Sequence, residues 1–509
     1  MASDRLDRRA LLRTAAASGA CAAVPCPAPQ VSGNAAIVQE NQREGTTDWQ
    51  LTRVRINRGT YRTSLIEGYC SHQSIAAGET LQVFVSTDPA STYRLEIFRM
   101  GYYGGLGARQ VAEFGPLQGI PQPVPEIGPR RIRQCRWEPA LEVRIPSEWL
   151  SGVYLGKLTT VPVGDRPYWQ SYIVFIVRDQ RQADILFQCS DNTWQAYNRW
   201  PENESLYTHP GGAHFPGVAV SFDRPYGKYC QILDAPLSVG SGEFLLWEYP
   251  LCFWLEQHGY DVTYCSNSDV LDADAVTRAR AFISVGHDEY WDLRQYRAVE
   301  SAIARGTNIL WLSGNSVYMV SPLEAAPDGR PGRILSRAGC YGALRSEESQ
   351  AYHQIFGPLQ SAGPDERRII GARTVVPFNG GGDWICTRPE HWAFANTGMR
   401  AGDAIPGLVG WEYHGDPDVH RPGLEVLGQG TAWAGGERPG RWAATIFPGG
   451  DQNFVFNAST VWWTQGLASP PGHMLPWSHF SRPHGPDPRV QQITHNLLKR
   501  ALATGRTIR

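Results

Sequence analysis

Three short apolar runs, each ending in a cluster of polar residues, constrain the fold of this chain more than any other feature. Segments with helical spacing, 244–258 and 293–305, lie between them, and a fourth strand candidate covers 261–265. Alternating strands and helices imply right-handed crossovers and a mainly parallel sheet. The apolar runs are residues 183–189, 281–285 and 308–312.

The polar clusters follow the strands at the point where each is expected to end. His287, Asp288 and Glu289 come after the second run, Asn315 after the third, and Tyr197 closes the segment after the first. Open α/β sheets bind ligands outside the carboxyl ends of their strands. The alternative is that Asp288 caps the next helix while its two neighbours are solvated turn residues. Convergence of several clusters on one crevice favours a functional site.

Eight short motifs follow one another along the chain. They are residues 99–105, 151–154, 193–198, 221–226, 286–291, 313–315, 410–412 and 455–458. In number and order they resemble the large subunit of N,N-dimethylformamidase and its relatives, over roughly residues 60 to 500. The resemblance implies an amide hydrolase that holds one iron through two tyrosines and one glutamate.

By this resemblance, the metal ligands are Glu289, Tyr197 and a second tyrosine. Tyr154 fits the second position by motif, while Tyr207 and Tyr168 compete with it. Two phenolates and one carboxylate suit Fe(III), a hard cation that prefers oxygen, and would neutralise its charge. Three protein ligands leave positions open for water and substrate. Ordinary core packing is the alternative for each tyrosine, and it holds for most of the 21 in the chain.

The resemblance also implies the residues that move protons. His287 corresponds to the catalytic imidazole, Asn315 to a polar group on the next strand, and Glu412 to the second carboxylate. The implied substrate is a small amide. A homo-oligomer or a small accessory subunit is left open.

The whole chain is expected to be multidomain α/β plus β, because 509 residues are too many for one core. Short alternating strands predict a β-sandwich over 50–180. Residues 181–509 are expected to form a three-layer α/β domain, glutamine-amidotransferase-like or doubly wound, with a β-rich insertion at about 320–445 covering the ligand edge. The glycines at 101–107 lack the lysine and following helix of a phosphate loop, so a hairpin is predicted there.

The N-terminus predicts export. Arg8 and Arg9 precede a small-residue, mildly apolar stretch, as in a twin-arginine signal, so residues 1–35 are expected to be a leader. The protein would then be periplasmic or extracellular, with a cytoplasmic location as the alternative. No run reaches the roughly 18 apolar residues of a membrane helix. Lys+Arg at 47 against Asp+Glu at 49 disfavours nucleic acid as a partner.

Other catalytic routes have less support. The chain has no G-x-S-x-G elbow, no H-E-x-x-H motif and no C-x-x-C pair among its 10 cysteines. Cys340, in the segment 338–342, is a weaker candidate nucleophile. An exported protein that binds a small molecule or carbohydrate on the same scaffold, without catalysis, is the non-enzymatic alternative.

Overall fold

The computed structural model describes most of the chain after residue 34, and the predicted twin-arginine segment lies outside the described residues. Many strands in several sheets and a smaller number of helices make up the fold, which confirms a mixed, strand-rich α/β class. The division into domains stays a prediction. The described residues are 35–208, 219–227, 229–230, 233–234, 236–343, 360–375, 380–435, 438–474 and 485–504.

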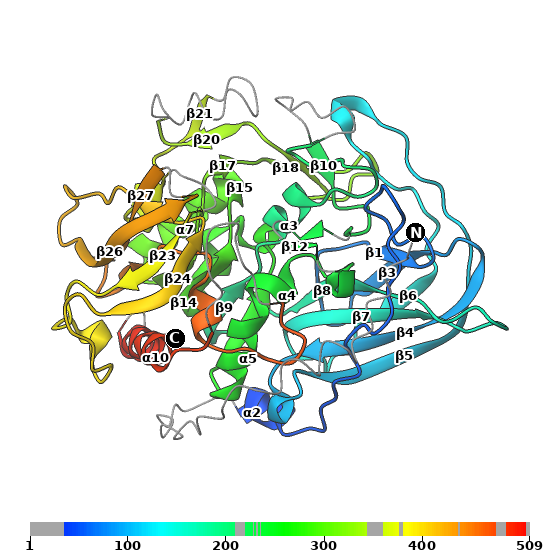
Figure 1. Ribbon diagram of the computed structural model, residues 1–509, viewed down its shortest axis with the longest axis horizontal. Coiled ribbons are helices and arrows are strands. Elements are labelled where there is room, and N and C mark those ends of the chain that lie inside the picture. Colours follow the sequence, from blue (N-terminus) through cyan, green and yellow to red (C-terminus); the bar gives the residue numbers. More distant parts are fainter. Residues whose placement is uncertain are drawn as a thin grey trace.

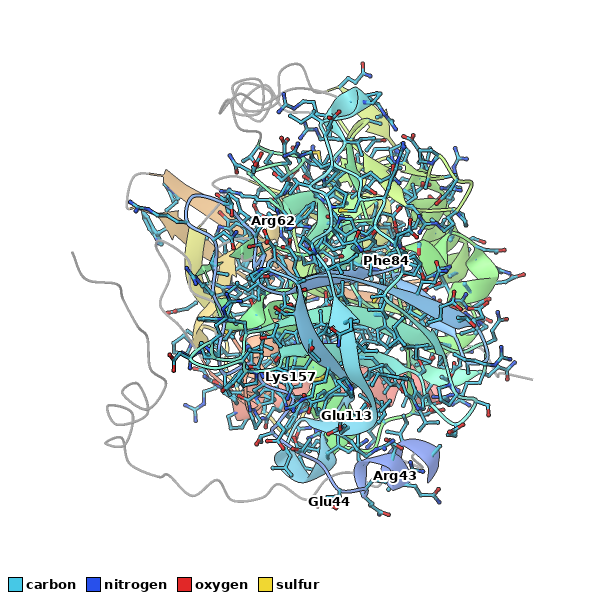
Figure 2. The ribbon with its side chains drawn as sticks, turned by 90° about the vertical axis from the view of Figure 1, so that its right-hand side faces the viewer. Arg43, Glu44, Arg62, Phe84, Glu113 and Lys157 are labelled. Carbon is cyan, nitrogen blue, oxygen red and sulfur yellow. The ribbon has the colours of Figure 1, made fainter. Side chains whose placement is uncertain are left out.

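The N-terminal strands form two sheets that share one core (Figure 1). One has the order β2-β8-β7-β4-β5 and the other β1-β3-β6. Side chains from both, including Val83, Leu95 and Phe175, belong to one buried cluster. Figure 2 faces this part of the molecule, with Phe84 of β3 and Lys157 of β7 labelled. The strands are β1 (Glu67–Cys70), β2 (Ser74–Ala76), β3 (Thr80–Ser86), β4 (Ser91–Met100), β5 (Ala108–Gly119), β6 (Leu141–Arg144), β7 (Gly152–Thr160) and β8 (Gln170–Arg178).

The glycine-rich segment 101–107 joins β4 to β5, which pair antiparallel, so the predicted hairpin is confirmed. Arg99 at its start forms a buried bidentate pair with Glu256, with contacts of 2.8 and 2.9 Å. Glu256 belongs to α5 (Tyr249–Gln257). A Cβ added at Gly101 would collide with the Glu256 carboxylate. Glycine therefore lets the hairpin approach this helix.

A nine-stranded sheet forms the second large unit, in the order β13-β9-β14-β16-β28-β27-β26-β23-β24. The pairings from β13 to β28 are parallel. The pairings from β28 to β24 are antiparallel. The sheet is thus less parallel than predicted, because strands between 380 and 448 extend it instead of only covering its edge. The strands are β9 (Ala183–Gln188), β13 (Val262–Cys265), β14 (Ala279–His287), β16 (Asn308–Gly314), β23 (Gly380–Ile385), β24 (Ala404–Trp411), β26 (Glu425–Ala434), β27 (Arg438–Pro448) and β28 (Phe454–Asn457).

Helices cover both faces of the parallel half. Alternate side chains of β14 point to opposite faces, as a strand requires. Phe282 packs in a cluster with Val299 of α7 (Leu293–Ala304), whereas Ile283 packs in the cluster that contains Leu251 of α5 and Leu497 of α10 (Pro488–Ala503). Both faces are therefore buried, which explains why the strand sequences read as continuous apolar runs.

The predicted helix 244–258 is divided into α4 (Phe244–Trp247) and α5. Pro250 lacks a backbone N–H and cannot donate to the carbonyl of Leu246. The side chain of Gln465 donates to that carbonyl instead, at 2.9 Å. No helix among the described residues has the length and apolarity needed to cross a membrane.

The remaining elements are short. Several of them lie around the carboxyl ends of the parallel strands. They are α2 (Ala35–Asn41), α3 (Asp191–Tyr197), α6 (Ala273–Val276), α9 (Arg367–Ile370), β10 (Ala219–Ser221), β11 (Tyr229–Cys230), β12 (Leu233–Asp234), β15 (Tyr290–Trp291), β17 (Met319–Val320), β18 (Leu323–Glu324), β19 (Ile334–Ser336), β20 (Gly339–Tyr341), β21 (Ser361–Gly363), β22 (Arg373–Thr374) and β25 (His414–Gly415).

Candidate active site

Two tyrosines converge on Glu289 just beyond the end of β14. Tyr197 donates its hydroxyl to Glu289 Oε2 at 2.7 Å, and Tyr207 donates to Oε1 at 2.9 Å. The two hydroxyls are 2.9 Å apart, and the rings stack with centroids 4.4 Å apart. Tyr197 is the last residue of α3, and Tyr207 lies in the loop that follows. Three oxygen-bearing side chains thus face one another.

A second group, His287, Glu412 and Asn315, adjoins the first. His287 Nε2 lies 2.7 Å from Glu412 Oε2 and 3.5 Å from Glu289 Oε2. Asn315 Nδ2 donates to the same Glu412 oxygen at 2.7 Å and lies 3.2 Å from His287 Nε2. These side chains are buried and come from the ends of β14, β16 and β24. Chain segments far apart in the sequence therefore build one cluster.

The orientation of the Asn315 amide follows from its partners. A carboxylate only accepts hydrogen bonds, so the amide nitrogen must face Glu412. The amide oxygen then faces Thr374, whose hydroxyl donates to it at 2.8 Å. The backbone of Asn315 is left-handed, with φ of +49°, a conformation that asparagine tolerates better than most residues. The turn after β16 consequently directs this amide toward the cluster.

Asp288 does not cap the next helix, and its neighbours are not solvated. The carboxylate of Asp288 is buried and accepts hydrogen bonds from Gln188, Asn267 and Ser284. The cap of α7 is Asp292, which accepts from the backbone of the second residue beyond it. The alternative interpretation of this turn is therefore wrong. The buried Asp288 network holds the turn that carries the histidine and glutamate on either side of it.

The close approach at Gly286 also shapes this turn. Its φ is +65°, and an added Cβ would collide with Trp247. Only glycine adopts such a backbone without steric penalty. The backbone N–H groups of Val317 and Tyr318 donate to the carbonyls of Asp288 and Glu289, each at 3.0 Å. The turns after β14 and β16 are thereby joined directly.

Burial and neighbouring charge shift the pKa values of the cluster. Burial, with the nearby Glu289 carboxylate, raises the pKa of Tyr197 and Tyr207 well above the ordinary phenol range. Burial is also the main reason that the pKa of Glu289 rises to about 7. Burial lowers the pKa of His287, but Glu412 and Glu289 outweigh it and bring the pKa to about 9. A cluster with this excess of acidic groups is suited to receive a positive charge.

Tyr154, the first choice for the second phenolate, lies elsewhere. Its ring stacks between Trp149 and Phe175 in the core of the N-terminal sheets, and its hydroxyl donates to the Leu150 carbonyl at 2.7 Å. Tyr154 lies in β7 and packs in the core, which is the alternative that the sequence left open for each tyrosine. The structure does not bring it to Glu289.

Of the two competitors, Tyr207 lies in the cluster and Tyr168 does not. The Tyr168 hydroxyl is 3.1 Å from Thr52 Oγ1. Tyr207 follows no strand and matches none of the motifs used to choose ligands. The only signal for it in the sequence is its position in the loop shortly after Tyr197.

The oxygen set around Glu289 fits a hard cation. The two phenol oxygens lie 2.9 Å from each other and 2.7 and 2.9 Å from the two oxygens of Glu289, and hard cations prefer oxygen ligands. Ligand atoms of His287, Glu289 and Glu412 also lie within 4.8 Å of one another. Glu289 belongs to both sets. A buried metal site is therefore possible here on geometric grounds, with Tyr197 and Tyr207 supplying the phenols.

Comparison with known proteins places the chain in a family. The family model described as N,N-dimethylformamidase beta subunit-like, C-terminal, matches residues 94–476, most of the chain. The chain belongs to this family. The dimethylformamidase-like match covers all the residues of the cluster. No protein with a curated description matches the chain.

A solved structure, a family 123 glycoside hydrolase from Clostridium perfringens that was determined to study glycolipid glycan hydrolysis, gives a partial alignment. The sequence identity is 11% and the TM-score is 0.11. The alignment covers 25% of this chain and 28% of that chain. Similarity at this level says nothing about fold or function.

Cys340, the alternative nucleophile, lies in β20 within an apolar cluster. It is buried, and its Sγ lies 3.5 Å from the Gln360 carbonyl. Thiols in apolar surroundings are poor nucleophiles because burial disfavours the thiolate. Seven buried cysteines carry free thiols: Cys70, Cys135, Cys189, Cys252, Cys265, Cys340 and Cys386.

Proposed function

We propose that this protein is a metal-dependent hydrolase of an amide C–N bond, of the dimethylformamidase type. The family match gives the class of reaction. The observation that carries the proposal is the arrangement around Glu289, which accepts hydrogen bonds from two phenols while His287 and Glu412 adjoin it. Tyr197, Tyr207 and Glu289 would hold the metal, and a second group of side chains would move protons.

The chemistry of the donors favours Fe(III) within this proposal. Phenols with raised pKa values release their protons only to a strong Lewis acid. Once ionised, Tyr197 and Tyr207 with Glu289 would balance three positive charges. A cation of this kind would polarise an amide carbonyl and lower the pKa of a bound water.

His287 and Glu412 are placed to transfer protons. His287 Nε2 and Glu412 Oε2 lie 2.7 Å apart in a buried contact. Glu412 would accept a proton from the attacking water, and the imidazolium form of His287 would deliver one to the leaving amine nitrogen. The amide nitrogen is a poor leaving group until it is protonated. Amide hydrolysis has two difficulties, the weak electrophilicity of the carbonyl and the poor leaving group. The metal would answer the first and this pair the second.

Asn315 is proposed as a donor to the oxygen of the substrate. One N–H of its amide is committed to Glu412. When His287 Nε2 is protonated it cannot accept the other, which is then available to a developing oxyanion. Loss of one such donor elsewhere lowers turnover by about 10²–10³-fold.

Two further parts of the proposal concern the setting of the enzyme. The family description names a beta subunit, which supports a partner subunit, and a homo-oligomer is the other arrangement we propose. Export through the twin-arginine pathway would suit a protein that receives its metal before transport. Light scattering of the purified protein measures its oligomeric state, and cell fractionation measures its export.

The test is a paired measurement of metal and turnover. The full chain is loaded separately with iron and with zinc, and each form is assayed against a panel of linear amides that includes dimethylformamide. Glu289→Gln serves as the matched variant, because it keeps the size of the side chain and removes its charge. We expect one metal-loaded form to hydrolyse an amide and Glu289→Gln to lose metal and turnover together. An iron- or zinc-replete protein that hydrolyses none of the panel would contradict the proposal.

A further inference from the structure

Arg224 is one of the largest fully buried side chains of the described residues. It belongs to the motif 221–226, which the proposed chemistry does not use. The carboxylate of Glu204, also buried, favours the charged form of Arg224. Burial lowers the pKa of its guanidinium to about 10, despite this carboxylate, so the group is charged at neutral pH. A charge buried in this way requires many hydrogen bonds to be tolerated.

Within the described part of the chain, the guanidinium donates to one segment, 195–204. Nε donates to Gln195 Oε1 at 2.8 Å, and Nη2 donates to the carbonyls of Gln195 and Asn198 at 3.2 and 2.9 Å. Nη1 donates to the carbonyls of Trp200 and Glu204 at 2.9 and 2.6 Å. Five contacts from one planar group thus span the chain from just before Tyr197 to just before Tyr207.

The same segment makes further hydrogen bonds to the residues that follow Arg224. The Asn198 side chain donates to the Pro225 carbonyl at 2.9 Å and accepts from the backbone of Gly227 at 3.0 Å. Beyond this segment, Leu206 N–H donates to the Ala196 carbonyl at 2.9 Å, which ties the residue before Tyr207 to the residue before Tyr197. The two ends of the loop are thus hydrogen-bonded to each other, and Arg224 is hydrogen-bonded to residues between them.

We infer that Arg224 is a positioning residue that sets the separation of the Tyr197 and Tyr207 hydroxyls, and thereby the metal affinity of the site. The part of this inference that concerns metal affinity rests on the proposed function, and the part that concerns the loop does not. A planar guanidinium can reach five acceptors at once, whereas the ammonium of lysine has three donors and no fork. Arg224→Lys therefore keeps the charge and removes the geometry.

A matched control is available in Arg99. It is as deeply buried as Arg224 and also makes several short hydrogen bonds, but to Glu256 and the N-terminal hairpin region. Arg99→Lys imposes the same chemical change without touching the tyrosine loop. Both variants are expected to lower the melting temperature, so thermal stability does not discriminate between them.

Two measurements discriminate. The first is amide hydrogen exchange of residues 195–208 in the metal-free protein, where we expect a several-fold increase in Arg224→Lys and no change in Arg99→Lys. The second is metal affinity by chelator competition, where we expect Arg224→Lys to bind at least about tenfold more weakly, as for other residues that orient ligands. If Arg224→Lys does not fold, Gln195→Met removes one acceptor and should change both quantities in the same direction.

The two arms separate this inference from the proposed function. Wild-type protein that binds no metal would refute the proposed metal site and leave the exchange measurement to decide the role of Arg224. Unchanged exchange over 195–208 in Arg224→Lys overturns the inference. Increased exchange with wild-type metal affinity would overturn its second half, the control of the site by the loop.

Discussion

The Glu412 carboxylate and the His287 imidazole meet at 2.7 Å, although they follow different strands of the nine-stranded sheet. β14 delivers the histidine from the parallel half, and β24 delivers the glutamate from the antiparallel edge. Glu412 is held over the parallel half by its backbone carbonyl, which accepts from Val461 N–H at 3.3 Å. The segment between 320 and 445 thus contributes a carboxylate that contacts His287.

His287→Ala tests the proposed role of the imidazole. The variant should retain metal, because Tyr197, Tyr207 and Glu289 are left intact, and should lose at least about 10²-fold in kcat, the contribution typical of a general acid or base. Metal analysis and steady-state assay on the same preparation check both halves. A metal-replete variant with wild-type kcat would remove His287 from the mechanism.

Glu412→Gln tests the proposed role of Glu412 as the base that accepts a proton from water. Glutamine can still accept a hydrogen bond from Asn315 but cannot take a proton from water. We expect a fall in kcat of about 10²-fold or more with little change in metal content. Glu425→Gln is the matched control, because this half-buried glutamate of β26 pairs with Arg388 and lies outside the cluster, so the variant should keep the wild-type kcat. Equal kcat in Glu412→Gln and the control would exclude Glu412 as the base.

His414 predicts a pH dependence of stability. Burial lowers its pKa to about 4, and its ring nitrogens contact Asn457 Oδ1 and Ser316 N–H, both at 2.8 Å. The unfolded chain, with a pKa of about 6.5, binds a proton between pH 6.5 and 4 that the native state does not, so stability falls as pH drops through this window. The contribution lost by pH 4.5 is on the order of 2 kcal/mol.

Urea unfolding of the metal-free protein at pH 7 and pH 4.5 measures this effect. His414→Gln cannot titrate, so its free energy of unfolding should fall less than that of wild type over the same interval. The comparison concerns the difference between the two pH values, because the substitution itself destabilises the protein at both. Parallel losses in the two proteins would show that His414 does not contribute.

Replacing Arg8 and Arg9 with lysine tests the export prediction. The twin-arginine pathway distinguishes arginine from lysine at these positions, so the variant should accumulate in the cytoplasm. Immunoblots of fractionated cells give the location. Wild-type export of the double variant would rule out this pathway.

The strands β9, β14 and β16 could be predicted because each is a continuous apolar run, buried on both faces. The expectation that Tyr197, His287, Glu289 and Asn315 lie together followed from the rule that strand ends converge. Glu412 came from the resemblance alone. The antiparallel half of the sheet was harder to predict, since its glycine- and tryptophan-rich strands lack a clear period of two.

Tyr207 was not the first choice because nothing local determines its place. It lies in an irregular loop, and its hydroxyl contacts Glu289, a residue distant in sequence. Tyr154, by contrast, sits in a motif but is required for packing between Trp149 and Phe175. Tertiary contacts of this kind leave no periodic trace in a single sequence.

Iron binding by wild type, Tyr207→Phe and Tyr154→Phe tests the central claim most directly. Each substitution removes one phenolic oxygen and keeps the ring, so packing is preserved in both. The account predicts that wild type and Tyr154→Phe bind one iron with a visible phenolate-to-iron absorption band, and that Tyr207→Phe weakens binding and loses or shifts the band. Full iron content and an unchanged spectrum in Tyr207→Phe would contradict it.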